Sequence, residues 1–296
     1  MYNQIDSNKR KTNLLIALFI GILMLAGYTW GYINGYGYTG LILALVISSI
    51  WTLISWQAGS KITLLSLGAH ELTDRSQFPT LWNTVENLSI TAGIPKPKIY
   101  IVDDPSPNAF ATGKDPDHAS VAVTTGLLQI LDKTELEGVL SHEISHIKNY
   151  DTRLMILIAV LVGALVMLGD WMFRGAIFGG RKREGGGVLM IIGLIFIVLS
   201  PVIAELIKLA ISRRREYLAD ASGALLTRYP DGLAAALEKI RDNATPMRRR
   251  SNATNHLWIS SPKANALNAK KVSGLFSTHP PIDDRIKNLR SMLSNP

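Results

Sequence analysis

The stretch Asp132–Asn149, DKTELEGVLSHEISHIKN, contains the H-E-x-x-H motif His142-Glu143-Ile144-Ser145-His146. The apolar residues around the motif recur three and four positions apart: Leu136, Val139, Leu140, Ile144 and Ile147. This spacing predicts a helix over the whole stretch, and Thr134 with Glu137 offers a capping box near its start. The motif is therefore expected on a helix.

Residues four apart on a helix lie on one face, so His142 and His146 can bind one metal ion. Glu143 is offset from His142 by about one hundred degrees, which places it beside the metal as a general base for water. The 296-residue chain has no Cys, so His, Asp or Glu must supply the ligands. The motif predicts one Zn²⁺ per chain in a metalloprotease. The alternative is a polar helix face with two solvated histidines.

A catalytic zinc site needs a third protein ligand. The metzincin pattern would require glycine and histidine where this chain has Asn149 and Thr152, so that pattern is excluded. A thermolysin-like pattern would place a glutamate some twenty residues after His146, but the first acidic residue in that apolar run is Asp170. The third ligand must come from further along the chain.

The best candidate for the third ligand is Glu216, in the sequence RRREYLAD. Asp220 lies one helical turn later on the same face, where it can accept the second N–H of a metal-binding histidine. Two alternatives remain: both acids could balance Arg213–Arg215 at the surface, or Glu205 could be the ligand, although Lys208 is placed to pair with it.

A membrane is the expected surrounding for the N-terminal part, because Thr12–Ser60 contains no Asp, Glu, Lys or Arg. Leu14–Ile33 is long enough to cross roughly 30 Å of hydrocarbon, and Leu41–Trp56 is a second span. Two later apolar runs, Leu154–Leu168 and Val188–Ala204, predict a second hairpin.

The distribution of Lys and Arg predicts the orientation. Lys9–Lys11 precede the first span and the loop at 34–40 is uncharged, which places the N-terminus and the following domain in the cytoplasm. Four basic residues in the loop between the last two runs disagree with this topology: Arg174, Arg181, Lys182 and Arg183. Whether the second hairpin fully spans the membrane stays open.

The predicted fold class is a mainly α membrane protein, with a zincin-like α+β metalloprotease domain that contains a small sheet and is flanked by transmembrane hairpins. The expected parts are 1–60 (first hairpin), 61–152 (protease domain with the motif helix), 153–211 (second apolar hairpin) and 212–296 (protease domain with the third ligand). Strands are predicted at Lys98–Val102 and Ala119–Thr124. Further helices are predicted at Phe78–Ala92, Glu216–Thr227, Gly232–Asp242 and Ile282–Leu293, and a mobile polar stretch at Asn243–Ser273.

Four features together resemble the HtpX family of bacterial membrane metalloproteases, relatives of the CAAX prenyl proteases: H-E-I-S-H, two apolar hairpins, R-R-R-E-Y-L-A-D, and S-T-H-P-P at 277–281. The resemblance covers nearly the whole chain. It implies zinc ligation by His142, His146 and Glu216, with Glu143 as general base and Asp220 supporting a ligand. It also implies a multi-pass protein of the bacterial cytoplasmic membrane that degrades damaged or misfolded membrane proteins on the cytoplasmic side.

The resemblance also suggests roles outside the zinc ligands. His279 would approach the site and stabilise the oxyanion, or else be held in a proline turn. The substrate cleft would involve Asn108, Ala109 and Phe110. Apart from the resemblance, Val121, Ala122 and Val123 are expected to form either an edge strand that pairs with an extended substrate or a plain core strand.

The expected partners are the lipid bilayer and unfolded or misfolded membrane-protein substrates. The net charge of +8 does not indicate nucleic acid, because the basic clusters lie beside apolar segments (Lys9–Lys11, Arg213–Arg215 and Arg248–Arg250). A transporter would need ionisable or broken positions inside several spans, and only Pro201 interrupts one. The other alternative is a non-catalytic membrane scaffold that binds zinc. The sequence makes no prediction about oligomeric state.

Overall fold

The computed structural model describes residues 2–33, 35–157, 213–248, 257–259 and 280–294. The described residues belong to two compact units: one contains Asp6–Gly59, and the other contains Ser60–Ile156 with the described residues from 213 onward. Most of the predicted second hairpin, the basic loop within it, Glu205 and His279 lie outside the described residues.

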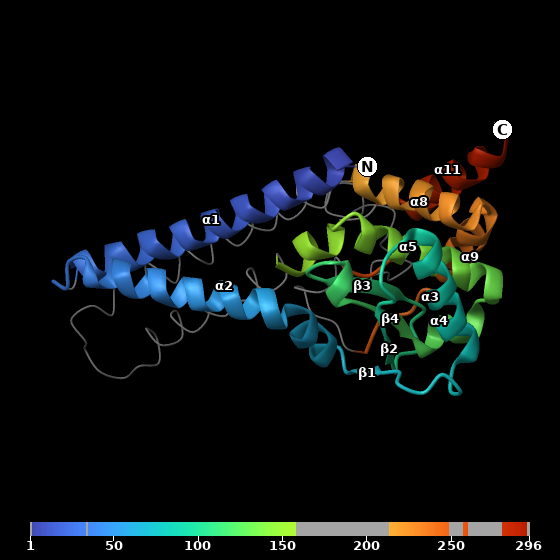
Figure 1. Cartoon of the computed structure of the whole chain (residues 1–296), viewed down its shortest axis with the longest axis horizontal. Helices are drawn as coiled ribbons and strands as arrows, with labels where there is room; N and C mark the ends of the chain where they lie inside the picture. Colours follow the sequence, from blue (N-terminus) through green and yellow to red (C-terminus); the bar gives the residue numbers. More distant parts are fainter. Residues whose placement is uncertain (1, 34, 158–212, 249–256, 260–279, 295–296) are drawn as a thin grey trace. The chain divides into compact units, whose positions relative to one another are not determined.

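The first unit contains most of a helical hairpin, α1 (Tyr2–Ile33) and α2 (Thr39–Ser66), whose helices meet at the loop that joins them and diverge from there (Figure 1). Both helices are long and apolar enough to cross a membrane. They approach closely near the hairpin end, since a Cβ on Gly27 would lie 2.5 Å from the Gly40 carbonyl oxygen. Small residues permit such close packing between membrane helices. Large apolar side chains are exposed along both helices: Leu14, Leu25, Ile42, Leu43, Ile47 and Leu53.

The second unit is built on a four-stranded sheet with the order β1-β2-β4-β3. Its strands are β1 (Ala69–Glu71), β2 (Lys98–Val102), β3 (Ala109–Gly113) and β4 (Ala119–Thr124). β2 and β4 are parallel, and the other two pairs are antiparallel. The two predicted strands, β2 and β4, are confirmed. β4 lies between two neighbours, so the interpretation of Val121, Ala122 and Val123 as an edge strand is wrong, and β3 forms that edge among the described strands.

The motif helix α5 (Lys133–Lys148) is the centre of this unit (Figure 1). It packs against β3 and β4 and against α3 (Pro79–Ala92), α8 (Arg213–Thr227) and α9 (Pro230–Asp242). Its start corrects one prediction: Asp132 accepts from the Glu135 N–H and Glu135 accepts from the Asp132 N–H. Asp132 lies one residue before the helix, which is the capping position. Thr134 lies inside the first turn and cannot cap the helix, so the predicted capping box of Thr134 and Glu137 is wrong.

Two glycines bring neighbouring helices close to α5. A Cβ on Gly138 would lie 2.5 Å from the Leu233 backbone nitrogen of α9, and a Cβ on Gly223 of α8 would lie 3.0 Å from the His142 backbone nitrogen. Because neither glycine carries a side chain, α9 and α8 can both pass directly beside α5.

The remaining described elements are η1 (Pro116–His118), α4 (Thr125–Ile130) and α11 (Ile282–Ser294). α11 packs on α8 and α9. Leu257–Ile259 is buried, its Trp258 ring meets Phe110 edge-on at 4.6 Å, and the Ile259 N–H donates to the Ala109 carbonyl at 2.9 Å. The expectation of mobility is therefore wrong for these three residues of the Asn243–Ser273 stretch.

Candidate metal centre

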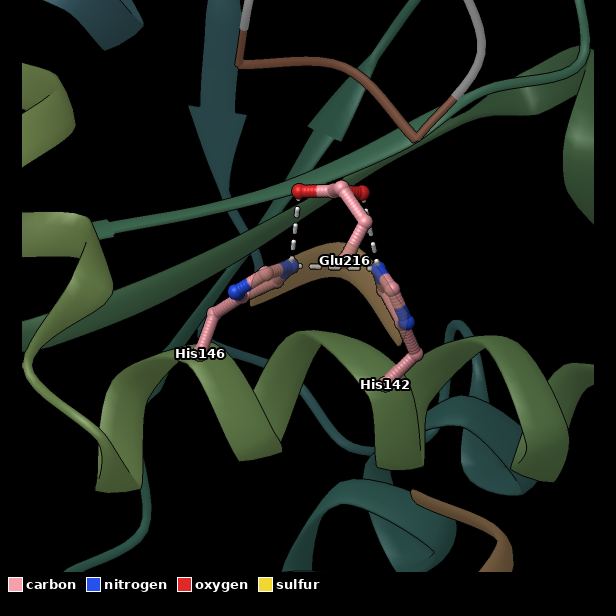
Figure 2. Close-up of side chains that lie close together, drawn as sticks. All are labelled: His142, His146 and Glu216. Carbon is pink, nitrogen blue, oxygen red and sulfur yellow. Dashed lines mark hydrogen bonds and ion pairs between the residues drawn. The ribbon is translucent and has the colours of Figure 1, made fainter. Parts of the chain in front are cut away.

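His142 and His146 project from one face of α5 toward Glu216 on α8 (Figure 2). The two histidine Nε2 atoms are 3.1 Å apart. Glu216 Oε2 lies 3.8 Å from His142 Nε2, and Glu216 Oε1 lies 3.6 Å from His146 Nε2. All three side chains are buried.

The residues fit a tetrahedral metal site. Ligands bound about 2.1 Å from a tetrahedral ion are about 3.4 Å from one another, which is close to the three separations seen here. Within the described part of the chain, these three residues form the group of His and acidic side chains able to hold one ion. The donors are two imidazoles and a carboxylate, a set that suits zinc and related divalent metals.

His142 is oriented from α8 and α11. Its Nδ1 lies 2.8 Å from Asp220 Oδ1, so the ring can donate Nδ1–H to the carboxylate and turn Nε2 toward Glu216. Arg285 of α11 binds the same carboxylate through Nε at 2.9 Å and Nη2 at 2.7 Å. Its Nη1 donates to the Ile259 carbonyl at 3.1 Å, and Arg285 itself is buried.

His146 has an equivalent arrangement. Its Nδ1 lies 3.0 Å from Asp151 Oδ2. Asp151 Oδ1 in turn lies 3.5 Å from Nη1 of Arg215, the residue before Glu216. Asp151 and Arg215 are both about 1% exposed. Each histidine is thus backed by one buried carboxylate, and each of these carboxylates is paired with one buried arginine.

The charge of this group suits a divalent cation. It contains four buried carboxylates (Glu143, Asp151, Glu216 and Asp220) and two buried guanidiniums (Arg215 and Arg285). With neutral imidazoles, two negative charges remain in a water-poor interior, where an uncompensated charge is costly. One divalent cation would balance them.

Glu143 is buried beside the ligands. Burial raises its pKa to about 7, with a contribution from the negative Glu216, while His146 and a hydrogen bond from the Ala111 backbone N–H act in the opposite direction. A carboxyl whose pKa is close to neutral can both accept and return a proton, as a general base and acid must. The Ala111 bond also ties Glu143 to strand β3.

Without a metal, the two histidines have opposite pKa shifts. Burial and the positive Arg285 lower the pKa of His142 to about 4, although Asp220 opposes them. Burial also disfavours the charged form of His146, but Asp151 and Glu216 outweigh it and raise its pKa to about 9. The metal-free site therefore holds one proton on His146 at neutral pH, in the place where an ion would bind.

The structure brings together five predicted residues: His142, Glu143, His146, Glu216 and Asp220. Their proposed roles stay predictions, as does that of His279, which lies outside the described residues. Among the predicted cleft residues, Asn108, Ala109 and Phe110 are buried at or beside the start of β3.

Three buried residues at this site escaped the sequence analysis: Asp151, Arg215 and Arg285. A signal existed for two of them. Arg285 falls three residues after Ile282 and four before Leu289, on the apolar side of an amphipathic helix. Arg215 precedes the small residues Ala219 and Gly223 at intervals of four, on the face that packs against α5. Asp151 carried no comparable pattern.

The fold and the site define a membrane metalloprotease. The sequence model that represents Peptidase family M48 matches residues 75–293, which is most of the chain. The chain belongs to peptidase family M48, and its relatives place it in the HtpX group of that family.

Those relatives carry the name Protease HtpX homolog. The protein of Dictyoglomus turgidum is 50% identical over 292 residues, which cover 98% of this chain and 94% of the relative. The protein of Listeria monocytogenes serotype 4a is 45% identical over 307 residues, which cover 99% and 100%. The crystal structure of Ste24p from S. mikatae has a similar fold, with a TM-score of 0.52 at 19% identity over 98% of this chain and 67% of that one.

Proposed function

We propose that the protein is a zinc endopeptidase whose metal is held by His142, His146 and Glu216. The observation that carries this proposal is the convergence of the three side chains within 3.1–3.8 Å, with the buried Glu143 beside them. Zinc is the metal chosen because the ligands are two imidazoles and a carboxylate and because one divalent ion balances the buried charge. Glutamate as the third ligand corresponds to the gluzincin type.

Zinc bound here would acidify water and polarise the scissile carbonyl. Glu143 takes one proton from the attacking water as the new C–O bond forms. Glu143 then delivers that proton to the amide nitrogen as the C–N bond breaks, and the second proton of the water stays on the new carboxyl group, so that the products are a carboxylic acid and an amine. Asp220 and Arg285 keep His142 in the tautomer that leaves Nε2 available to the metal.

An extended polypeptide is the proposed substrate, bound along β3. β3 is the outer strand of the described sheet, and its Ala111 N–H faces Glu143, so a substrate chain added at this edge would run past the general base. The Ile259 N–H already donates a hydrogen bond to the Ala109 carbonyl. A substrate N–H can therefore bond to that carbonyl only by displacing Ile259. Extended binding suits unfolded chains, because a folded protein rarely offers a free strand.

The proposed role is removal of damaged or misfolded membrane proteins at the cytoplasmic face of the bacterial membrane. The apolar hairpin of α1 and α2 would keep the enzyme among such substrates. Lys9–Lys11 before the first span favour a cytoplasmic N-terminus and a cytoplasmic active site.

Casein cleavage by the purified full-length protein tests this function. We expect cleavage with zinc, none after chelation, recovery when zinc is returned, and loss of both zinc and activity in Glu216→Ala. A folded, zinc-loaded protein that cleaves neither casein nor an unfolded membrane protein would instead support the non-catalytic scaffold.

A further inference from the structure

We infer that Asp151, held by Arg215, is a positioning residue that fixes His146 for the metal. The inference rests on the proposed zinc site and adds two residues to it. Asp151 would set both the ring orientation and the tautomer of His146, while Arg215 would keep the carboxylate in place.

The contact between Asp151 and His146 has the geometry for this role. When the neutral ring of His146 donates Nδ1–H to Asp151 Oδ2 at 3.0 Å, its lone pair lies on Nε2, the atom that a metal would bind. That atom faces His142 Nε2 at 3.1 Å and Glu216 Oε1 at 3.6 Å, which is the side where the ion binds. His146 is 5% exposed and Asp151 is 1% exposed, so bulk water has little access to replace the carboxylate.

The backbone after α5 is shaped to bring Asp151 back to the helix that it follows. Asn149 caps α5, and Tyr150 has φ 59°, in the left-handed region that residues with a side chain rarely adopt. Thr152 then anchors the turn, because its Oγ1 donates to the Gly113 carbonyl of β3 at 3.0 Å. A non-glycine residue held at positive φ is a feature that the surrounding structure must maintain.

Arg215 connects this carboxylate to the third ligand. It directly precedes Glu216 on α8, and its Nη1 lies 3.5 Å from Asp151 Oδ1. Of the three consecutive arginines at 213–215, only Arg215 is buried. α8 therefore supplies Glu216 and also holds the residue that orients His146, so a shift of α8 would disturb two ligands together.

The arrangement mirrors the one at His142. There, Asp220 contacts Nδ1 at 2.8 Å and Arg285 pairs with Asp220. Both imidazoles that face the metal thus have the same kind of support, a carboxylate on Nδ1 backed by a guanidinium. A carboxylate on the outer nitrogen of a metal-binding histidine fixes its orientation and strengthens metal affinity.

The experiment measures zinc affinity of the full-length protein in detergent by competition with a chromophoric chelator. It is done above the pKa of about 9 of His146 in the metal-free site, so that no proton on His146 competes with zinc. Asp151→Ala should weaken zinc binding about 10- to 100-fold. Asp151→Asn should recover part of that loss, because the amide oxygen can still accept from Nδ1–H. The zinc affinity of Arg215→Met should lie between those of wild type and Asp151→Ala. The absorption spectrum of the cobalt(II)-loaded protein should change in Asp151→Ala, since it reports ligand geometry and not stability.

Asp104→Asn is the matched control. Asp104 is also 1% exposed, but its oxygens accept from the backbone N–H groups of Ser106 and Arg248 instead of from a histidine. This variant should lose thermal stability and keep the zinc affinity and cobalt spectrum of wild type. If Asp151→Ala does not fold, Asp151→Asn and Arg215→Met provide the comparison.

The outcomes separate this inference from the proposed function. Wild-type zinc affinity and an unchanged cobalt spectrum in the Asp151 and Arg215 variants would overturn the positioning role and leave the protease intact. A wild-type protein that binds no zinc through His142, His146 and Glu216 would overturn both.

Discussion

Arg285 and Asp220 form a two-pronged ion pair that is buried against His142 of the candidate metal site. The guanidinium donates through Nε at 2.9 Å and Nη2 at 2.7 Å, and the same carboxylate contacts His142 Nδ1 at 2.8 Å. Burial alone would raise the pKa of Asp220, but Arg285 and His142 outweigh it and lower that pKa to about 2. The carboxylate is therefore ionised at neutral pH.

Arg285→Met should destabilise the fold, because it leaves Asp220 as a buried charge with only a histidine beside it. Removing one partner of a buried ion pair costs about 3–5 kcal/mol in the free energy of unfolding. Arg290→Met on the same helix is the control, since Arg290 is exposed and pairs with Glu238 at the surface. Such pairs contribute about 0–1 kcal/mol. Denaturant unfolding in detergent compares the two variants, and equal losses would contradict the assignment.

Zinc affinity should rise with pH. A zinc ligand must be a neutral imidazole, and the pKa of His146 is raised to about 9 in the metal-free site. Below that pH, binding must expel one proton, so the affinity should increase about tenfold per pH unit and level off above it. His142, with its pKa lowered to about 4, is already neutral and releases none. Calorimetry in buffers of different ionisation enthalpy measures the number of protons released when zinc binds. Zinc binding without proton release at neutral pH would contradict this prediction.

The cleavage rate should also rise with pH on its acid side. Glu143 must be ionised to take a proton from water, and burial raises its pKa to about 7 in the metal-free site. A bound cation favours the ionised form, so the midpoint of the rise in kcat/KM should lie at or below about 7. A pH profile of kcat/KM for the wild-type protein tests directly whether the rate rises with pH. A rate that falls as the pH increases toward 7 would exclude Glu143 as the general base.

Gly138→Ala should separate α5 from α9. The added Cβ would lie 2.5 Å from the Leu233 nitrogen and 2.7 Å from its Cα, which are backbone atoms that cannot turn away. Overpacking of this kind costs about 1–3 kcal/mol, more than the gain of about 1 kcal/mol in helix propensity. Gly21→Ala in α1, where a Cβ has nothing within 4 Å, should be neutral or stabilising. Thermal melts compare the two variants.

The residues that gather at the candidate metal site could be predicted from sequence because helical spacing is a local property. His142 and His146 are four residues apart on one helix, and so are Glu216 and Asp220 on another. The chain does not match the metzincin or the thermolysin-like ligand pattern, so the third ligand had to come from further along the chain, where Glu216 was the best candidate. The same local logic located β2 and β4, whose β-branched residues alternate or cluster.

Strand β3 and the two buried ion pairs could not be predicted, because they depend on tertiary structure. β3 contains two alanines, a threonine and a glycine among its five residues, so its sequence gives little strand signal. Arg285 pairs with Asp220 across 65 positions, and Arg215 pairs with Asp151 across 64, because helix packing and not periodicity brings them together. Burial of a basic residue on an apolar helix face was the one available hint, and it does not name the partner.

Glu143 is proposed to perform the proton transfer at a metal held by other residues. The most direct test measures zinc content and casein cleavage of Glu143→Gln in the same preparation. We predict one zinc per chain, as in wild type, with cleavage reduced about 10²- to 10⁴-fold. A zinc-loaded Glu143→Gln protein that cleaves casein at the wild-type rate would contradict the account.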